Sequence, residues 1–208
     1  MDNYKKNLKL LTDNHVYSKE MEHDACGVGL IASTEGKKSR EIVEYGIEAL
    51  KAVWHRGAVD ADGKTGDGAG IHVEIPKEFS KEKIEVTGHV YDNSEICIGM
   101  IFLPRNNYEA QESCRTLVEK ELTQNDFNIY GWRQVPVNTK VLGEKAEQTR
   151  PEITQVLFRH NNQKLSGKSL EIKLYETRRK IENNVRQNHL DNFYICSFSS
   201  KSIIYKGM

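Results

Sequence analysis

The sequence lacks the features that mark several common classes of protein. Its 208 residues include only four cysteines, and no two of them form a Cys-x-x-Cys pair. A disulfide framework and a structural zinc site are therefore not expected. The longest apolar run, residues 96–103, ends at Pro104. It is far shorter than the roughly 20 residues that a membrane helix requires, so the membrane is not an expected partner.

No excess of one charge is present either. The 30 Lys and Arg residues balance 30 Asp and Glu residues, so the formal net charge at pH 7 is zero. Such a chain has no net field that would hold it on a phosphate backbone, and nucleic acid is not an expected partner. Residues 1–25 mix Lys with acidic side chains and contain neither Arg nor an apolar core. They resemble neither a signal peptide nor a mitochondrial presequence, so we expect a cytoplasmic protein with a polar leader.

Apolar periodicity predicts both strands and helices in the first part of the chain. Residues 26–32 are apolar and rich in Gly, which is typical of a buried strand, and a turn is expected at residues 33–36. A helix is expected from Ser39, because Ser is a favoured N-cap and apolar residues follow at helical spacing. After a polar loop over residues 58–68, the alternation in residues 71–75 predicts a half-buried strand. The pattern indicates a βαβ-like beginning.

The later part of the chain is also mixed, and its length suits one substantial core. We expect a buried strand, a helix, a further strand, an alternating segment that turns helical, and two strands that flank a Ser-Ser-Lys-Ser turn like a hairpin. In order, these are residues 96–103, 107–125, 132–137, 170–175, 178–185, 193–198 and 203–205.

The polar loop suggests two binding motifs that its spacing does not support. The Gly-Lys-Thr triplet at residues 63–65 resembles the end of a phosphate-binding loop, but Ala58 stands where that motif needs its first Gly. Asp60 and Asp62 match the first two ligands of a calcium loop, but Ile71 stands where a bidentate Glu should close the shell. Neither a phosphate site nor a metal site is therefore expected here.

Cys26 lies at the junction between the polar leader and a glycine-rich segment. From this pattern alone, Cys26 is either a core residue at the start of a strand or a nucleophile. The other cysteines, Cys97, Cys114 and Cys196, lie in apolar runs or in a helical pattern. We expect these three to be buried as small hydrophobic residues.

Two motifs in the sequence resemble the large subunit of glutamate synthases. Residues 22–32, EHDACGVGLIA, are similar to the maturation junction of that family, and residues 54–71 are similar to its next signature. Shorter similarities lie at residues 131–136, 149–153, 193–197 and 202–208. The resemblance extends over nearly all of the chain after residue 20 and implies an N-terminal class II glutamine amidotransferase domain.

The resemblance implies an N-terminal nucleophile hydrolase, an α+β fold arranged as a four-layer αββα sandwich. In that family a leader, here residues 1–25, is removed so that Cys26 becomes the first residue. Its α-amino group, with an ordinary pKa of about 7.7–8.0, acts as the base toward its own thiol. The thiolate would attack the side-chain amide of L-glutamine and release ammonia, and water would hydrolyse the resulting thioester to glutamate.

The same resemblance implies supporting roles for four residues around the nucleophile. Arg56, Gly57, Asp67 and Gly68 are expected to bind substrate or to organise the site. The structural alternatives are that Arg56 is an ion-pair partner and that the glycines only form turns.

The sequence ends before two motifs that the resemblance assigns to the oxyanion hole and the substrate clamp. These are an Arg-Tyr-Ser-Thr segment and an Asn-Gly-Glu-Ile-Asn segment. We therefore expect residues 26–208 to be a partial domain, incomplete at its C-terminus. Because the loss of one oxyanion donor typically lowers the rate by about 10²–10³, we expect these 208 residues alone to be nearly inactive.

The expected cofactors and partners belong to the longer family protein. No cofactor is expected in this chain, whereas FMN and an iron–sulfur cluster are implied for later domains. Ammonia would pass to a synthase domain acting on 2-oxoglutarate, with electrons from a reductase subunit using NADPH or NADH, or from ferredoxin. The competing hypothesis is a non-catalytic interaction module that retains the glutaminase fold. Cleavage of the bond between Ala25 and Cys26 distinguishes the two.

Overall fold

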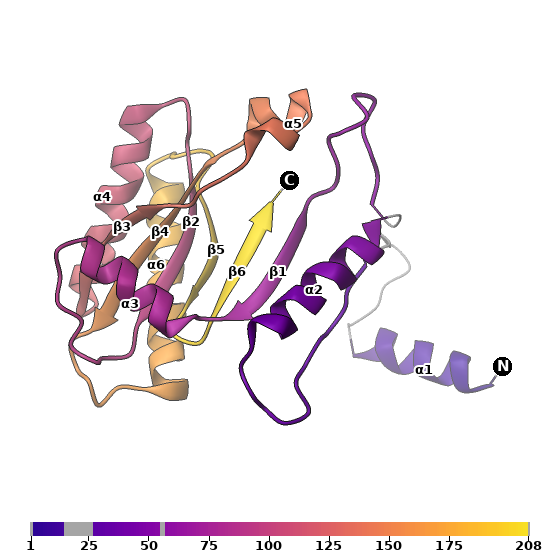
Figure 1. Ribbon diagram of the computed structural model, residues 1–208, viewed down its shortest axis with the longest axis horizontal. Coiled ribbons are helices and arrows are strands. Elements are labelled where there is room, and N and C mark those ends of the chain that lie inside the picture. The colour runs from indigo at the N-terminus through magenta and orange to yellow at the C-terminus, as the bar shows by residue number, and fades with distance from the viewer. Residues whose placement is uncertain (1, 15–26, 55–56, 208) are drawn as a thin grey trace.

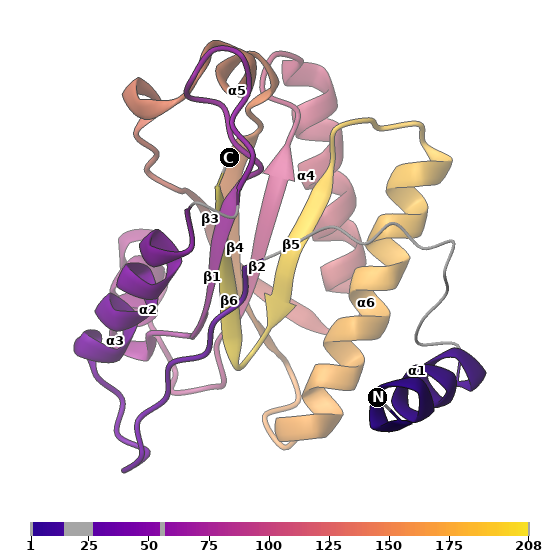
Figure 2. The same cartoon turned by 90° about the vertical axis from the view of Figure 1, so that its right-hand side faces the viewer.

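The computed structural model describes residues 2–14, 27–54 and 57–207. The described chain forms two antiparallel sheets with helices on their outer faces (Figures 1 and 2). None of the described helices is both long and apolar enough to cross a membrane. In chain order the elements are α1 Asp2–Asp13, α2 Arg40–Ala52, β1 Ala69–Glu74, α3 Lys77–Val86, β2 Cys97–Leu103, α4 Tyr108–Gln124, β3 Phe127–Gln134, the 3-10 helix η2 Thr139–Val141, α5 Glu144–Thr149, β4 Glu152–His160, α6 Gly167–Gln187, β5 Tyr194–Ser199 and β6 Ser202–Gly207.

The larger sheet has the strand order β3-β4-β2-β5, with every neighbouring pair antiparallel. Its central strand β2 is buried on both faces. Cys97 and Ile101 pack into a core shared with α4 and α6, whereas Ile98 and Met100 pack into a second core that also contains Ile203 of β6. A strand covered on both sides must be apolar along its whole length. The buried strand predicted at residues 96–103 is therefore confirmed.

Helices α4 and α6 cover one face of this sheet (Figure 2). Helix α4 begins after Asn107, whose side chain accepts a hydrogen bond from the Ala110 amide at 3.0 Å, and its predicted apolar face is buried at Cys114, Val118 and Leu122. The helix predicted over residues 107–125 is thus confirmed. Strand β3 lies slightly earlier than the strand predicted at residues 132–137.

Helix α6 corrects one prediction from the sequence. The alternation in residues 170–175 predicts an extended segment, yet one continuous helix spans it. Leu170, Leu174 and Ile181 are buried on one side of this helix, while Ile172 is 50% exposed. A strand would place Leu170, Ile172 and Leu174 on the same face. The segment is helical because apolar residues continue at helical spacing through the following residues and form one buried stripe.

The smaller sheet pairs β1 with β6 in antiparallel register, with Ile71 opposite Tyr205. Helix α2 contacts β1 and lies on its outer side (Figure 1). The Ser39 hydroxyl accepts a hydrogen bond from the Ile42 amide, so the predicted N-cap is confirmed. The strand predicted at residues 71–75 is confirmed as β1.

The link between β5 and β6 corrects a second prediction. The two strands and their turn are present, but they do not form a hairpin, because β5 pairs with β2 in the larger sheet and β6 pairs with β1 in the smaller one. Cys196 and Ile203 both pack in the core between the sheets. The Ile204 amide donates to the Ser197 hydroxyl at 3.1 Å, so a side chain bridges the two strands. The chain passes from one sheet to the other because this arrangement buries the apolar faces of both β5 and β6.

The first predicted strand is a third correction. Cys26 lies outside the described residues, and residues 27–32 form no strand. Val28 and Leu30 are each 90% exposed. Glycine loses more backbone entropy on ordering than any other residue, and no described strand pairs with this segment to offset that loss. The βαβ-like beginning is therefore wrong, and β1 is the first strand of the described chain.

The structure predicts a clear difference between two neighbouring substitutions in α6. Leu174→Ala is expected to lower the free energy of unfolding by about 2–5 kcal/mol, because it opens a cavity in the core. Ile172→Ala, two residues earlier but half exposed, is expected to lower it by less than about 1 kcal/mol. Urea denaturation, monitored by circular dichroism, measures the free energy of unfolding of both variants. Equal losses would mean that the two side chains share a buried face, as in a strand.

Candidate active site

The predicted site residues are divided between described and undescribed parts of the chain. Cys26 and Arg56 lie outside the described residues. Gly57, Asp67 and Gly68 are described, and all three belong to the segment of residues 57–68, which we call the signature loop. The loop connects the end of α2 to the start of β1 (Figure 1).

The base of the signature loop is closed by Asp67. Its Oδ2 accepts a hydrogen bond from the Ala58 amide at 2.7 Å, and next to this contact Val59 and Gly66 form an antiparallel bridge. Gly68 has a φ of 84°, a left-handed conformation that favours glycine, and it leads directly into β1. Asp67 therefore holds the two ends of the loop together, and Gly68 forms the turn into β1. At its start, the Gly57 amide donates to the Trp54 carbonyl at 3.0 Å.

The tip of the signature loop is organised by Asp62. Its Oδ1 accepts hydrogen bonds from the amides of Lys64 and Thr65 at 2.9 and 2.7 Å, and its Oδ2 accepts one from the Thr65 hydroxyl. The Thr65 hydroxyl and these two amides hold the pKa of Asp62 well below its ordinary value. The carboxylate that could have suggested a calcium ligand is thus engaged with the loop itself.

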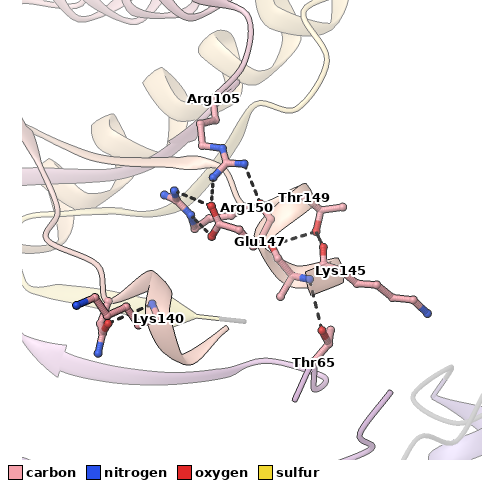
Figure 3. Close-up of polar contacts among 9 residues, drawn as sticks. Thr65, Arg105, Lys140, Lys145, Glu147, Thr149 and Arg150 are labelled. Carbon is pink, nitrogen blue, oxygen red and sulfur yellow. Dashed lines mark hydrogen bonds and ion pairs between the residues drawn. The ribbon is translucent and has the colours of Figure 1, made fainter. Parts of the chain in front are cut away.

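A contact partner of the loop that sequence reasoning missed is α5. Lys145 Nζ lies 2.7 Å from Asp60 Oδ2. The Ala146 amide donates to the Thr65 hydroxyl at 3.4 Å, and Figure 3 shows Thr65 next to α5. The Lys145 amine, followed by the Ala61 amide, lowers the pKa of Asp60. Gly143, just before α5, packs directly against Asp62 and Thr65. Residues 149–153 carry part of the family resemblance, but no local sequence pattern relates α5 to a loop about 80 residues earlier.

The three described cysteines are buried and lie in separate elements, β2, α4 and β5. Burial raises the pKa of the Cys97, Cys114 and Cys196 thiols, to about 11 for Cys114. Since the thiolate is the nucleophilic form, none of these three is suited to nucleophilic catalysis near neutral pH. The prediction that they are buried as small hydrophobic residues is confirmed.

Comparison with known proteins identifies the family. Residues 26–208 match the class-II glutamine amidotransferases. The chain therefore belongs to this family of enzymes. The match contains the signature loop, all the described strands and the three buried cysteines.

The chain is also similar to large chains of glutamate synthases. It is 54% identical over 205 residues to the glutamate synthase [NADPH] large chain of Azospirillum brasilense, a match that covers 99% of this chain and 14% of that protein. It is 38% identical over 188 residues to ferredoxin-dependent glutamate synthase 2 of Synechocystis sp., covering 90% of this chain and 12% of that protein. It is 36% identical over 197 residues to the glutamate synthase [NADPH] large chain of Bacillus subtilis, covering 93% of this chain and 12% of that protein. The chain thus spans about an eighth of the length of these relatives.

The hydrogen bonds at Asp62 predict the pH dependence of the loop tip. Donors that stabilise the carboxylate lower its pKa in the folded state, so they stabilise the loop above pH 3.8, and this contribution is lost as the pH falls through the lower folded value. Thr65→Val removes the hydroxyl donor and should move the pKa of Asp62 up toward 3.8. NMR titration of the Asp62 carboxyl carbon measures this pKa in the unmodified protein and in Thr65→Val. A midpoint of 3.8 or higher in the unmodified protein would contradict the described geometry.

Proposed function

We propose that this domain is the glutaminase part of a glutamate synthase. It hydrolyses L-glutamine to glutamate and ammonia, and the ammonia passes to a synthase domain that acts on 2-oxoglutarate. The observation that carries the proposal is the combination of two similarities. The class-II glutamine amidotransferase match begins at Cys26, and nearly the whole chain is similar to glutamate synthases of both the NADPH and the ferredoxin type.

Cys26 is the nucleophile in this proposal. The other three cysteines are buried with raised thiol pKa values, which leaves Cys26 as the cysteine with the required chemistry. Removal of residues 1–25 frees the α-amino group of Cys26. With an ordinary pKa of about 7.7–8.0, a fraction of this amine is unprotonated near neutral pH and can accept the thiol proton. One residue then supplies both nucleophile and base.

The proposed reaction has two steps. The Cys26 thiolate attacks the side-chain amide carbon of glutamine, the C–N bond breaks, and ammonia leaves with the proton that the α-amine had taken from the thiol. Water then attacks the thioester carbon, the C–S bond breaks, glutamate is released, and a proton of that water passes to the Cys26 sulfur. Arg56 and the base of the signature loop organise the surroundings of the nucleophile. The hydrogen bond from Ala58 to Asp67 supports this role, because it fixes the loop that follows Arg56 in the chain.

The layered structure supports an αββα sandwich as the fold. Helix α2 lies outside the smaller sheet, and α4 and α6 lie outside the larger one (Figure 2). The core that contains Met100, Leu157 and Ile203 fills the space between the sheets. We propose that these layers correspond to the sandwich of N-terminal nucleophile hydrolases.

The described residues do not supply the ligands of the iron–sulfur cluster that is expected of a complete glutamate synthase. An iron–sulfur cluster needs several thiolates at one point. Cys97, Cys114 and Cys196 come from separate elements, and the described chain contains no group of three or more His, Cys, Asp or Glu side chains placed to hold a metal. We propose that the cluster, FMN and the contact with a reductase subunit or ferredoxin belong to other parts of the longer protein. A cytoplasmic location stays a prediction.

The first test concerns maturation. In the complete, active protein we expect Cys26 to be the amino-terminal residue, because the self-base mechanism needs its α-amino group. Intact mass spectrometry and Edman sequencing of the purified enzyme determine the terminus. A fully active enzyme that still begins at Met1 would rule out this mechanism, whereas an uncut and inactive protein would favour the interaction-module hypothesis.

The second test separates the two nitrogen sources. Cys26→Ala in the complete enzyme should abolish glutamate synthesis from glutamine, by at least about 10³-fold, because no other described cysteine can replace the nucleophile. Synthesis from free ammonium should persist, since that reaction bypasses the glutaminase site. Cys114→Ala is the matched control and should retain both activities. Equal loss with glutamine and with ammonium would show that Cys26 has a structural role instead.

A further inference from the structure

The signature loop is held at its tip by a segment that is remote in the sequence. Three contacts join them: the ion pair from Lys145 to Asp60, the hydrogen bond from Ala146 to Thr65, and the packing of Gly143 against the loop. Figure 3 shows Thr65 directly below α5, with its hydroxyl directed at the helix. The base of the loop is closed by its own residues, whereas the position of the tip depends on α5.

Helix α5 is itself tied to the central sheet. Glu147 forms ion pairs with both Arg105 and Arg150, and Arg105 also donates to the Glu147 carbonyl at 2.8 Å (Figure 3). Arg105 follows β2, and Arg150 precedes β4. The two central strands of the larger sheet therefore fix α5 from both sides. The Arg150 and Arg105 guanidinium groups lower the pKa of Glu147, so this carboxylate stays ionised at a more acidic pH than an ordinary glutamate does.

Gly143 shows that the loop and α5 are fitted closely together. Its φ of −74° and ψ of 164° are open to any residue, so the backbone conformation does not require glycine. The space does require it. A Cβ at this position would lie 2.2 Å from Thr65 Oγ1, 2.3 Å from Asp62 Oδ2 and 2.6 Å from the Thr65 amide nitrogen. Even alanine would force the loop backbone to move.

From these contacts we infer that α5 is a brace that positions the signature loop for glutamine hydrolysis, with Gly143, Lys145 and Glu147 as positioning residues. The inference rests on the proposed glutaminase function. The loop begins immediately after Arg56 and contains Gly57, Asp67 and Gly68, so a displaced tip shifts the geometry on which the site depends. The Lys145–Asp60 pair is exposed and contributes little by itself. The close fit at Gly143 therefore carries most of the effect.

The test uses the complete, matured enzyme with Gly143→Ala, Lys145→Met and Lys145→Arg. Lys140→Met, an exposed lysine on the neighbouring 3-10 helix, is the matched control. Two quantities are measured: kcat and KM for glutamine against the ammonium-dependent rate, and the rate of trypsin cleavage after Lys64, followed by peptide mass mapping. Lys64 is exposed at the loop tip, so its cleavage reports the position of the loop without any reference to catalysis.

Gly143→Ala should accelerate cleavage after Lys64 and lower kcat/KM for glutamine by about tenfold to a hundredfold, because misplacement by about 1 Å has effects of this size. The ammonium-dependent rate should stay unchanged. Lys145→Met should give the same pattern with a loss of about fivefold or less, as expected for an exposed pair, and Lys145→Arg should restore it. Lys140→Met should match the unmodified enzyme in both measurements.

Two results would overturn the inference. Unchanged cleavage after Lys64 in Gly143→Ala and Lys145→Met would show that α5 does not hold the loop. Faster cleavage with unchanged kcat/KM for glutamine would show that the loop position does not affect the reaction. An unmodified enzyme that does not hydrolyse glutamine would instead refute the proposed function, and the cleavage rates would still decide whether the brace exists. Because Lys145→Met changes an exposed side chain, the test does not depend on whether Gly143→Ala folds.

Discussion

Burial of β2 on both faces is the constraint on which the rest of the described structure depends. One face packs against α4 and α6, and the other packs toward β6, so this single strand contributes to both cores. Its ends matter as much as its faces. Arg105, just beyond its last residue, contacts Glu147 in α5, and α5 in turn contacts the signature loop. The central strand of the sheet is thus connected to a surface loop through α5, by the ion pairs of Glu147 on one side and by the close fit of Gly143 against the loop on the other.

How well each part of the fold could be predicted depended on how far apart in the sequence its interacting residues lie. The Ser39 cap, the buried strand β2 and the apolar face of α4 depend on neighbouring residues, and the sequence pattern was sufficient for all three. The pairing of β6 with β1 instead of β5 depends on how two sheets bury their faces, which the Ser-Ser-Lys-Ser turn does not reveal. The alternation at residues 170–175 covers too few residues to separate a strand from one and a half turns of helix. Only the continuation of the buried stripe to Ile181 and Val185 resolves it.

The same distinction applies to the candidate site. Asp67 could be singled out beforehand through the family resemblance, and its structural contribution is a local hydrogen bond to Ala58. Asp60 and Asp62 have the spacing of cation ligands, but what occupies their oxygens could not be read from that spacing. Asp62 accepts from donors within its own loop, whereas Asp60 is paired with Lys145, which is 85 residues away in the chain. A long-range ion pair of this kind leaves no periodic signal in the sequence, so the contacts of Gly143 and Lys145 with the loop could be identified only from the structure.

The pairing of β1 with β6 has a consequence for the order in which the protein assembles. Ile71 lies opposite Tyr205, so the register of this sheet closes a loop that contains most of the chain. Contacts between such distant residues form late, because the entropy of closing the loop is lost before the contact is gained. Among the described strands, β1 has β6 as its sole neighbour in the sheet, and the signature loop runs directly into β1. During synthesis on the ribosome, all four strands of the larger sheet emerge before β6. The end of the signature loop therefore acquires the support of β6 only after the strands of the larger sheet have left the exit tunnel.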